Sequence, residues 1–123
     1  MESSCAAERK ALADEFEQCR KVFIALGDEN RQGIFIALLE HEPIGMRVPE
    51  ITEQTHLSRP AVSHHLKILK EAGLIALQRV GTKNYYYVSA AEQCWDGLKN
   101  LVSHVDDVVR AANKNGYPHF VDR

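Results

Sequence analysis

The segment 58–74 carries the clearest structural signal in this chain, and it predicts a helix over about 59–72. Apolar residues recur along it at the spacing of one helical face: Val62, Leu66, Leu69 and Ala72. Ser58 can cap the N-terminus through its hydroxyl, Pro60 is tolerated in the first turn, and Gly73 can end the helix in a left-handed conformation. The segment therefore predicts a capped helix with one buried face.

The opposite face of this predicted helix carries hydrogen-bond donors, most of them cationic: Arg59, Ser63, His64, Lys67 and Lys70. Such a face suits the edge of a nucleic acid, although a solvated surface helix has a similar composition. Residues 58–88 contain five lysines and arginines against the single acid Glu71, a net charge of +4, in a chain whose total charge is −2. Positive charge gathered in one segment favours a phosphate-binding surface.

A shorter helix is predicted directly before this one, over about 48–54. Pro49 lies in its first turn, and Ile51 is the residue expected to face inward. Two such helices joined by a short turn form a helix-turn-helix, whose second helix enters the major groove of DNA. We therefore expect a helix-turn-helix over about 48–72.

The pattern after this helix changes from helical to alternating. Residues 74–80 and 84–88 are rich in β-branched and aromatic side chains, and the glycine-containing turn between them predicts a hairpin. Arg79 and Lys83 lie near the tip of this hairpin. A basic hairpin directly after a recognition helix is the wing of a winged helix, which we expect over about 74–88.

Two longer helices are predicted at the ends of the chain, over about 6–26 and 90–112. Each has one apolar stripe, formed in the first by Leu12, Phe16, Cys19, Phe23 and Leu26, and in the second by Trp95, Leu98, Val102, Val105, Val109 and Ala112. A winged core does not need two such helices for its own burial, so we expect them to pair with each other and with a second subunit. The alternative is that both cover the core of a monomer.

These elements, with a further helix at about 29–41, predict a single winged helix-turn-helix domain over residues 1–123. Its fold class is mostly α with a small β-hairpin wing, and it contains about five helices.

The remaining composition excludes other classes of protein. No apolar run reaches the roughly 20 residues that cross a bilayer, and the N-terminus lacks the layout of a signal peptide, so a cytoplasmic protein without a membrane partner is expected. The three cysteines are widely spaced and form no Cys-x-x-Cys pair, which excludes a zinc ribbon. No glycine-rich phosphate loop, His-Glu-x-x-His motif or nucleophile elbow is present, so no enzyme is predicted.

The order of these elements, together with the sequence of residues 58–75, closely resembles the ArsR/SmtB family of bacterial winged-helix repressors. The segment 25–31 resembles the start of the second helix of that family, and 81–87 resembles its wing. The resemblance covers roughly residues 16–110. It implies a homodimer joined through the first and last helices, which binds an inverted-repeat operator in double-stranded DNA and is released by an inducer.

The resemblance also implies roles for individual residues. Four fall on positions that face DNA in the family: Ser58, Arg59, Ser63 and His64. Three cations are better assigned to phosphates: Lys67, Arg79 and Lys83. Arg59 stands where many members carry glutamine, and arginine prefers guanine whereas glutamine prefers adenine, so the operator sequence should differ. We expect His65 to pack against the helix-turn-helix core.

The family's divalent-metal site is incomplete in this sequence. Members that sense zinc, cobalt or nickel carry an Asp-x-His pair early in the last helix, at positions occupied here by Ala91 and Gln93. The late half is approximated by His104 and Asp107, which remain metal candidates, but two ligands per half-site cannot satisfy tetrahedral zinc. No cofactor is therefore assigned, and a metal ion or a thiol-reactive inducer stays open as an effector. The alternative for His104 is a solvated or interface-edge polar residue.

Cysteine chemistry offers another effector site. Members that sense thiophilic metals carry a Cys-x-Cys pair, at positions occupied here by Arg47 and Pro49. Cys19 and Cys94 lie on the first and last predicted helices, so their sulfurs could be close if those helices pair. They do not match the cysteine pair of the sulfur-responsive members, because Ile36 occupies one of those positions. The alternative is that both are inert, buried and hydrophobic.

The predicted function is thus a sequence-specific DNA-binding regulator, most simply a dimeric repressor released by an inducer. Two alternatives remain open: a winged-helix protein-interaction module, which would not need the cationic segment 58–88, and a repressor controlled by thiol oxidation or arsenite in place of a divalent metal.

Overall fold

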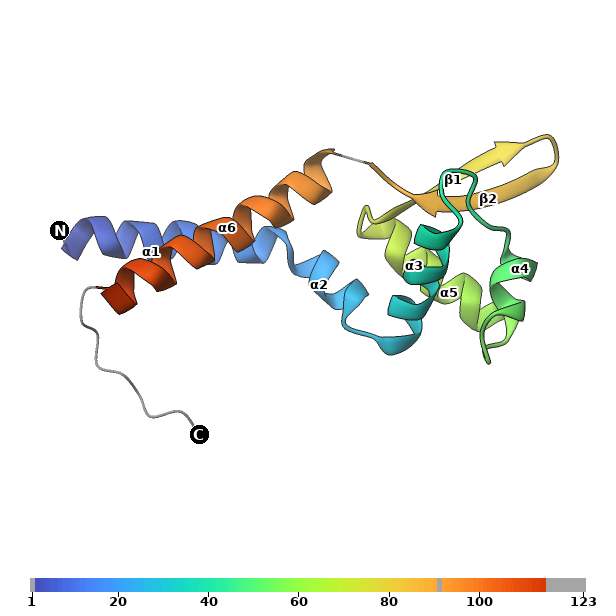
Figure 1. Ribbon diagram of the computed structural model, residues 1–123, viewed down its shortest axis with the longest axis horizontal. Helices are drawn as coiled ribbons and strands as arrows, with labels where there is room; N and C mark the ends of the chain where they lie inside the picture. Colours follow the sequence, from blue (N-terminus) through green and yellow to red (C-terminus); the bar gives the residue numbers. More distant parts are fainter. Residues whose placement is uncertain (1, 91, 115–123) are drawn as a thin grey trace.

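The computed structural model describes residues 2–90 and 92–114, which form six α-helices and one antiparallel hairpin (Figure 1). The helices are α1 (Glu2–Gln18), α2 (Arg20–Leu26), α3 (Glu29–Glu40), α4 (Val48–Glu53), α5 (Arg59–Glu71) and α6 (Glu92–Lys114), and the strands are β1 (Ile75–Val80) and β2 (Lys83–Val88). The predicted fold class, mostly α with a hairpin wing, is confirmed.

The molecule has two parts along its long axis (Figure 1). Helices α1 and α6 contact each other and extend to one side, while α2–α5 and the hairpin form a body at the other end. The apolar core lies in this body, where its largest fully buried side chains are Ile34, Leu38, Met46, Ile51, Val62, Leu66, Leu69 and Leu74. Burying each such side chain stabilises the fold by about 1.5–3 kcal/mol.

The prediction of one continuous helix over 6–26 is wrong, because the helix is interrupted at Cys19. The backbone of Cys19 has φ −95° and ψ 3°, and its N–H bonds to the carbonyl of Phe16 three residues earlier. The interruption lets α2 place Val22 and Ala25 in the core while α1 runs along α6. The apolar stripe that is continuous in the sequence thus packs partly along α6 and partly in the core of the body. As a result, the described residues contain six helices where about five were expected.

The loop before α4 is part of the hairpin's support. Met46 is fully buried and exchanges two backbone hydrogen bonds of 2.8 Å with Tyr86 of β2. Gly45 precedes it with φ +87°, a left-handed conformation that favours glycine. The Glu42 carboxylate accepts a 2.8 Å hydrogen bond from the N–H of Val88. These contacts hold the base of the hairpin against the helical body.

The hairpin turn is one residue shorter than predicted. Val80 pairs with Lys83, so the turn consists of Gly81 and Thr82, and Lys83 is the first residue of β2. Gly81 has φ +64° at the first turn position, which only glycine adopts without strain. Within the described helices, no stretch combines the length and the hydropathy needed to cross a membrane.

Candidate functional site

The N-terminus of α5 is built as the sequence predicts. Ser58 has an extended backbone, and its hydroxyl accepts a 3.3 Å hydrogen bond from the N–H of Ala61. Pro60 lies in the first turn. Val62 and Leu66, on the inner face, are fully buried. Because the inner face is fixed in the core, the opposite face of the helix is held toward solvent.

The outer face of α5 presents the side chains predicted to contact DNA. Arg59, Ser63, His64 and Lys67 are all exposed. Among the residues that the structure describes, none of these four side chains forms a hydrogen bond or an ion pair, and the imidazole of His64 lies 5.9 Å from that of His65. Their donors are therefore available to a ligand.

The hairpin adds two exposed cations to this end of the molecule. Lys83 begins β2, and Arg79 uses its Nε–H to donate a 3.1 Å hydrogen bond to the carbonyl of Gly81. Figure 1 shows the hairpin tip and the N-terminal end of α5 on the side of the body away from α1 and α6. The N-terminal end of α5 and the hairpin tip, which carry most of the residues predicted to contact DNA, thus lie on the same side of the body.

His65 is turned toward the body, as expected, and its partner is Arg31 of α3. His65 is half-buried, and its Nδ1 lies 3.2 Å from Nη1 of Arg31. The same guanidinium donates hydrogen bonds to the last carbonyls of α2, 2.8 Å to Ala25 and 3.1 Å to Ile24. Arg31 therefore joins α2, α3 and α5.

Arg31 was not singled out from the sequence, although a local signal was available. Asp28 caps α3 by accepting a 3.0 Å hydrogen bond from the backbone N–H of Arg31. This bond is the main reason that the pKa of Asp28 lies below its ordinary value. A capping aspartate fixes the residue three positions later in the first turn, but the long-range contacts of that residue depend on tertiary structure.

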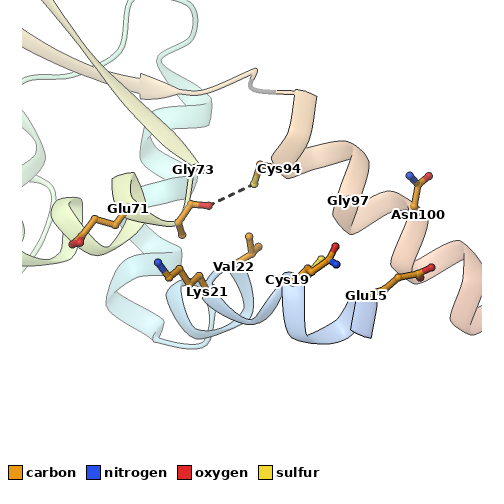
Figure 2. A pocket seen from close by; sticks show the side chains of 11 residues that line it. Glu15, Cys19, Lys21, Val22, Glu71, Gly73, Cys94, Gly97 and Asn100 are labelled. Atoms are coloured by element: carbon orange, nitrogen blue, oxygen red, sulfur yellow. Dashed lines mark hydrogen bonds between the residues drawn. The ribbon is translucent and has the colours of Figure 1, made fainter. Parts of the chain in front are cut away.

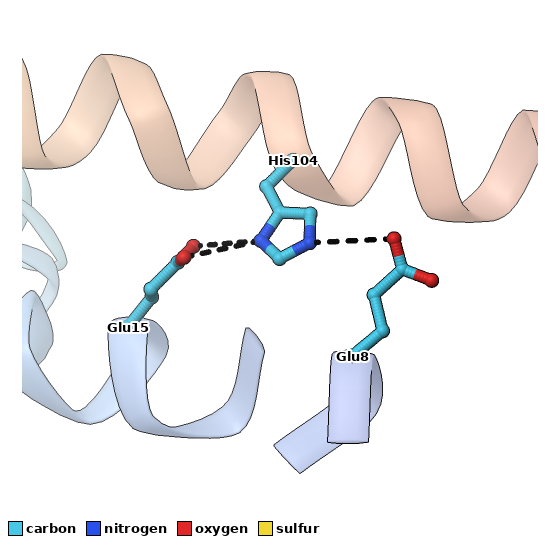
Figure 3. A network of polar contacts seen from close by, with 3 residues as sticks. All are labelled: Glu8, Glu15 and His104. Atoms are coloured by element: carbon cyan, nitrogen blue, oxygen red, sulfur yellow. Dashed lines mark hydrogen bonds and ion pairs between the residues drawn. The ribbon is translucent and has the colours of Figure 1, made fainter. Parts of the chain in front are cut away.

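His104 of α6, a metal candidate from the sequence, instead contacts two carboxylates of α1 (Figure 3). Its Nδ1 lies 3.0 Å from a carboxylate oxygen of Glu15, and its Nε2 lies 3.9 Å from Glu8. Asp107 is exposed, and Ala91 lies outside the described residues. No group of three or more His, Cys, Asp or Glu side chains in the described ranges is arranged to hold a metal ion.

The contact between Glu15 and His104 raises the pKa of the imidazole above its ordinary value, mainly through their hydrogen bond. The contact therefore stabilises the docking of α1 on α6 below the ordinary pKa of histidine and is lost as the pH rises through the raised pKa. We expect Glu15→Gln to lower the pKa of His104, measured by NMR titration, by more than Glu8→Gln does, because Glu8 is farther away. An unchanged pKa in Glu15→Gln would contradict this assignment.

Cys19 and Cys94 line one cavity of about 520 Å³, between the junction of α1 and α2, the end of α5 and the start of α6 (Figure 2). Cys19 is buried and Cys94 is half-buried, and both are free thiols. The thiol of Cys94 donates a weak 3.8 Å hydrogen bond to the carbonyl of Ala72. Burial, and secondarily the neighbouring Cys19, raise the pKa of Cys94. The two cysteines that the sequence suggested as a thiol effector site thus line one cavity at the C-terminal end of α5.

Comparison with known proteins gives consistent results. Residues 28–76 match the family described as bacterial regulatory protein, arsR family. An uncharacterized helix-turn-helix-type transcriptional regulator of Methanocaldococcus jannaschii is 33% identical over 95 residues, which are 77% of this chain and 99% of that protein. The transcriptional repressor SmtB homolog of Synechocystis is 30% identical over 76% of this chain and 68% of its own length.

Solved structures share the fold. An ArsR-like transcriptional regulator from Rhodococcus superposes with a TM-score of 0.63 at 24% identity, over 85% of this chain and 97% of that chain.

Proposed function

The chain belongs to the ArsR family of DNA-binding transcriptional regulators, which are not enzymes, and on that premise we propose that it is a dimeric repressor that an inducer releases from an inverted-repeat operator. The observation that carries this proposal is the set of unpartnered donors on the outer face of α5, together with the exposed cations of the hairpin, whose tip lies on the same side of the body as the N-terminal end of α5 (Figure 1). Repression is supported by the relatives named as transcriptional repressors in Synechocystis and Bacillus subtilis. The expected cytoplasmic location follows, because a regulator acts where its DNA is.

The DNA contacts divide into two classes. We assign four exposed donors at the start and along the outer face of α5 to the major groove: Ser58, Arg59, Ser63 and His64. We assign three cations to phosphates: Lys67, Arg79 and Lys83. Arg79 donates its Nε–H within the hairpin turn, which fixes its stem and leaves its terminal nitrogens to meet a phosphate.

A second subunit is supported by apolar side chains left exposed on the long helices. Phe16 of α1 is 53% exposed, and Val102 and Val109 of α6 are 60% and 50% exposed. Val102 and Val109 lie seven residues apart on one stripe of α6, which also includes the half-buried Trp95. A twofold dimer through these helices would cover this stripe, and its symmetry would match an inverted repeat.

The rival function, a protein-interaction module without DNA binding, does not need the exposed cations of α5 and the hairpin. It predicts that the chain selects no DNA sequence, and the same experiment separates the two functions.

That experiment is selection from random duplex DNA, followed by sedimentation of the complex with the enriched sequence. We expect an inverted repeat whose half-sites are separated by about one helical turn, roughly 34–36 Å, or a multiple of it. We also expect two protein chains on each duplex. Enrichment of a single half-site bound by one chain would contradict the dimer, and failure to enrich any sequence would favour the interaction module.

A further inference from the structure

We propose that Arg31 is a positioning residue for operator reading, because its hydrogen bond to His65 sets the orientation in which α5 presents its outer face to DNA. Arg31 acts through His65 and not on the DNA itself. This inference rests on the proposed function, since it concerns how the same helix is held against the operator. The observations that carry it are the contacts of α5, the partners of the guanidinium, the tautomer of His65 and the place of His65 on the helix.

The first observation is how α5 is fixed to the rest of the body. Its inner face packs through fully buried side chains, among them Val62, Leu66 and Leu69. Burial of apolar surface is non-directional, so it holds the helix in the core without favouring one rotation sharply. Across the side chains that the structure describes, one hydrogen bond joins a side chain of α5 to another element, namely the 3.2 Å contact between His65 Nδ1 and Arg31 Nη1. That contact therefore supplies the directional restraint.

The second observation is that the guanidinium of Arg31 is itself held in place. Its Nε donates a 2.8 Å hydrogen bond to the carbonyl of Ala25, and its Nη2 donates one of 3.1 Å to the carbonyl of Ile24. These carbonyls lie at the C-terminal end of α2, where they carry partial negative charge. The backbone N–H of Arg31 is bonded to the capping Asp28. A planar guanidinium with a partner at each nitrogen is a rigid fork, which can fix the position of His65.

The third observation is that the contact selects one tautomer of His65. A guanidinium has only donors, so Nδ1 of His65 must accept, and the proton of the neutral ring is on Nε2. None of the described groups bonds to Nε2, so Arg31 alone makes this selection. A proton on Nδ1 would point at the N–H of Arg31 and break the contact. The tautomer is therefore a spectroscopic marker of the contact.

The fourth observation is the place of His65 on α5. It follows Ser63 and His64, which are assigned to bases, and it precedes Lys67, which is assigned to a phosphate. Residues that read a ligand must be held within about 0.5 Å and roughly 10–20° of the productive geometry. A phosphate contact depends mainly on charge, and a flexible lysine accommodates a small shift. A change in the orientation of α5 should therefore impair base reading more than general DNA affinity.

The test begins with Arg31→Lys, which keeps the charge and removes the fork. A single ammonium cannot bond to both carbonyls of α2 and to His65 at once. Because mutation of residues that link two sites changes their coupling by about 2–30-fold, we expect discrimination of the selected operator from random duplex to fall by that factor for each half-site. The affinity for random duplex and the slope of log affinity against log salt should stay as in the parent chain.

Arg20→Lys is the matched control. It makes the same substitution at the first residue of α2, where the guanidinium pairs with Glu17 on the exposed surface. It should leave operator discrimination unchanged.

Variants of His65 test whether Arg31 acts through this ring. His65→Leu removes the acceptor and should reproduce the loss of discrimination, and its combination with Arg31→Lys should add little further loss. His65→Asn places a side-chain oxygen near the position of Nδ1 and should retain more discrimination than His65→Leu. If Arg31→Lys unfolds on a thermal scan, the comparison of His65→Asn with His65→Leu decides the question.

Nitrogen NMR of the imidazole in the free chain provides a readout that a loss of stability alone would not change. We expect His65 in the Nε2–H tautomer in the parent chain and in Arg20→Lys, and a mixture of tautomers in Arg31→Lys.

The inference is overturned if Arg31→Lys and His65→Leu both keep the discrimination of the parent chain, or if their losses add in full. It is also overturned if Arg31→Gln weakens every duplex equally and lowers the salt slope while Arg31→Lys binds as the parent does, because Arg31 would then contact a phosphate. A parent chain that selects no DNA sequence refutes the proposed function, whereas a selected operator with unchanged discrimination in both variants refutes only the role of Arg31.

Discussion

Gly45→Ala is expected to be strongly destabilising, because it adds a clash to a strained backbone. The left-handed φ of +87° at this position costs an L-residue about 1–3 kcal/mol. An added Cβ would also overlap the carbonyl of Tyr86, lying 2.9 Å from its carbonyl carbon and closer still to its oxygen. The backbone at Gly45 and at Tyr86 cannot move apart without breaking the paired hydrogen bonds between Met46 and Tyr86. Overpacking therefore adds about 1–3 kcal/mol to the loss in free energy of unfolding.

Two other glycines provide matched controls for this prediction. Gly81→Ala meets the same kind of strain, with φ +64°, but nothing lies within 4 Å of its added Cβ. It should cost about 1–3 kcal/mol in free energy of unfolding. Gly33→Ala, inside α3, meets neither strain nor a neighbour within 4 Å and should stabilise the helix by about 0.8–1 kcal/mol.

Urea unfolding followed by circular dichroism measures all three free energies. If Gly45→Ala costs no more than Gly81→Ala, the close approach of Gly45 to Tyr86 does not contribute to stability. If both variants are neutral, the left-handed conformations at these turns are not maintained in solution.

Arg59→Ala is expected to reduce discrimination of the operator from random DNA by about 5–150-fold for each half-site, which corresponds to about 1–3 kcal/mol for each bidentate contact with guanine. Arg59 is exposed at the first position of α5, so its removal should leave the free energy of unfolding unchanged. The measurement is the dissociation constant for the selected operator, for operators substituted at each base pair, and for random duplex. Loss of preference should be confined to one position in each half-site.

Lys83→Ala is the matched control, since it also removes an exposed cation from the proposed DNA-facing end. It should weaken binding to every duplex alike and reduce the slope of log affinity against log salt by about 2, because one phosphate contact is lost from each of the two proposed subunits. If Arg59→Ala weakens binding to the operator and to random DNA equally, Arg59 contacts a phosphate and does not read a base.

The elements with local signals were predictable from the sequence. Ser58 caps α5, and the apolar spacing of Val62 and Leu66 places its buried face, so this helix and its outer face were predicted correctly. The hairpin was predicted because its alternation and turn glycine are also local. The turn differed by one residue, since the pairing of Val80 with Lys83 depends on strand register.

Features that depend on distant partners were not predictable. The apolar stripe through Cys19 is continuous in sequence, and nothing in it indicates that residues before and after Cys19 face different partners. Met46 is fully buried because Tyr86 pairs with it, forty residues later along the chain. The shared cavity of Cys19 and Cys94 was conditional on the pairing of the end helices, which the contact between α1 and α6 supplies.

The interruption at Cys19 divides the N-terminal region into two helices that pack on different neighbours. Helix α2 anchors the core through Val22 and Ala25, and it is fastened by Arg31 to α3 and the recognition helix. Helix α1, in contrast, packs along α6. Substitutions on the exposed side of α1 should therefore leave the support of α5 intact. If the proposed dimer forms through α1 and α6, its subunit interface and its operator preference can diverge separately within one short chain.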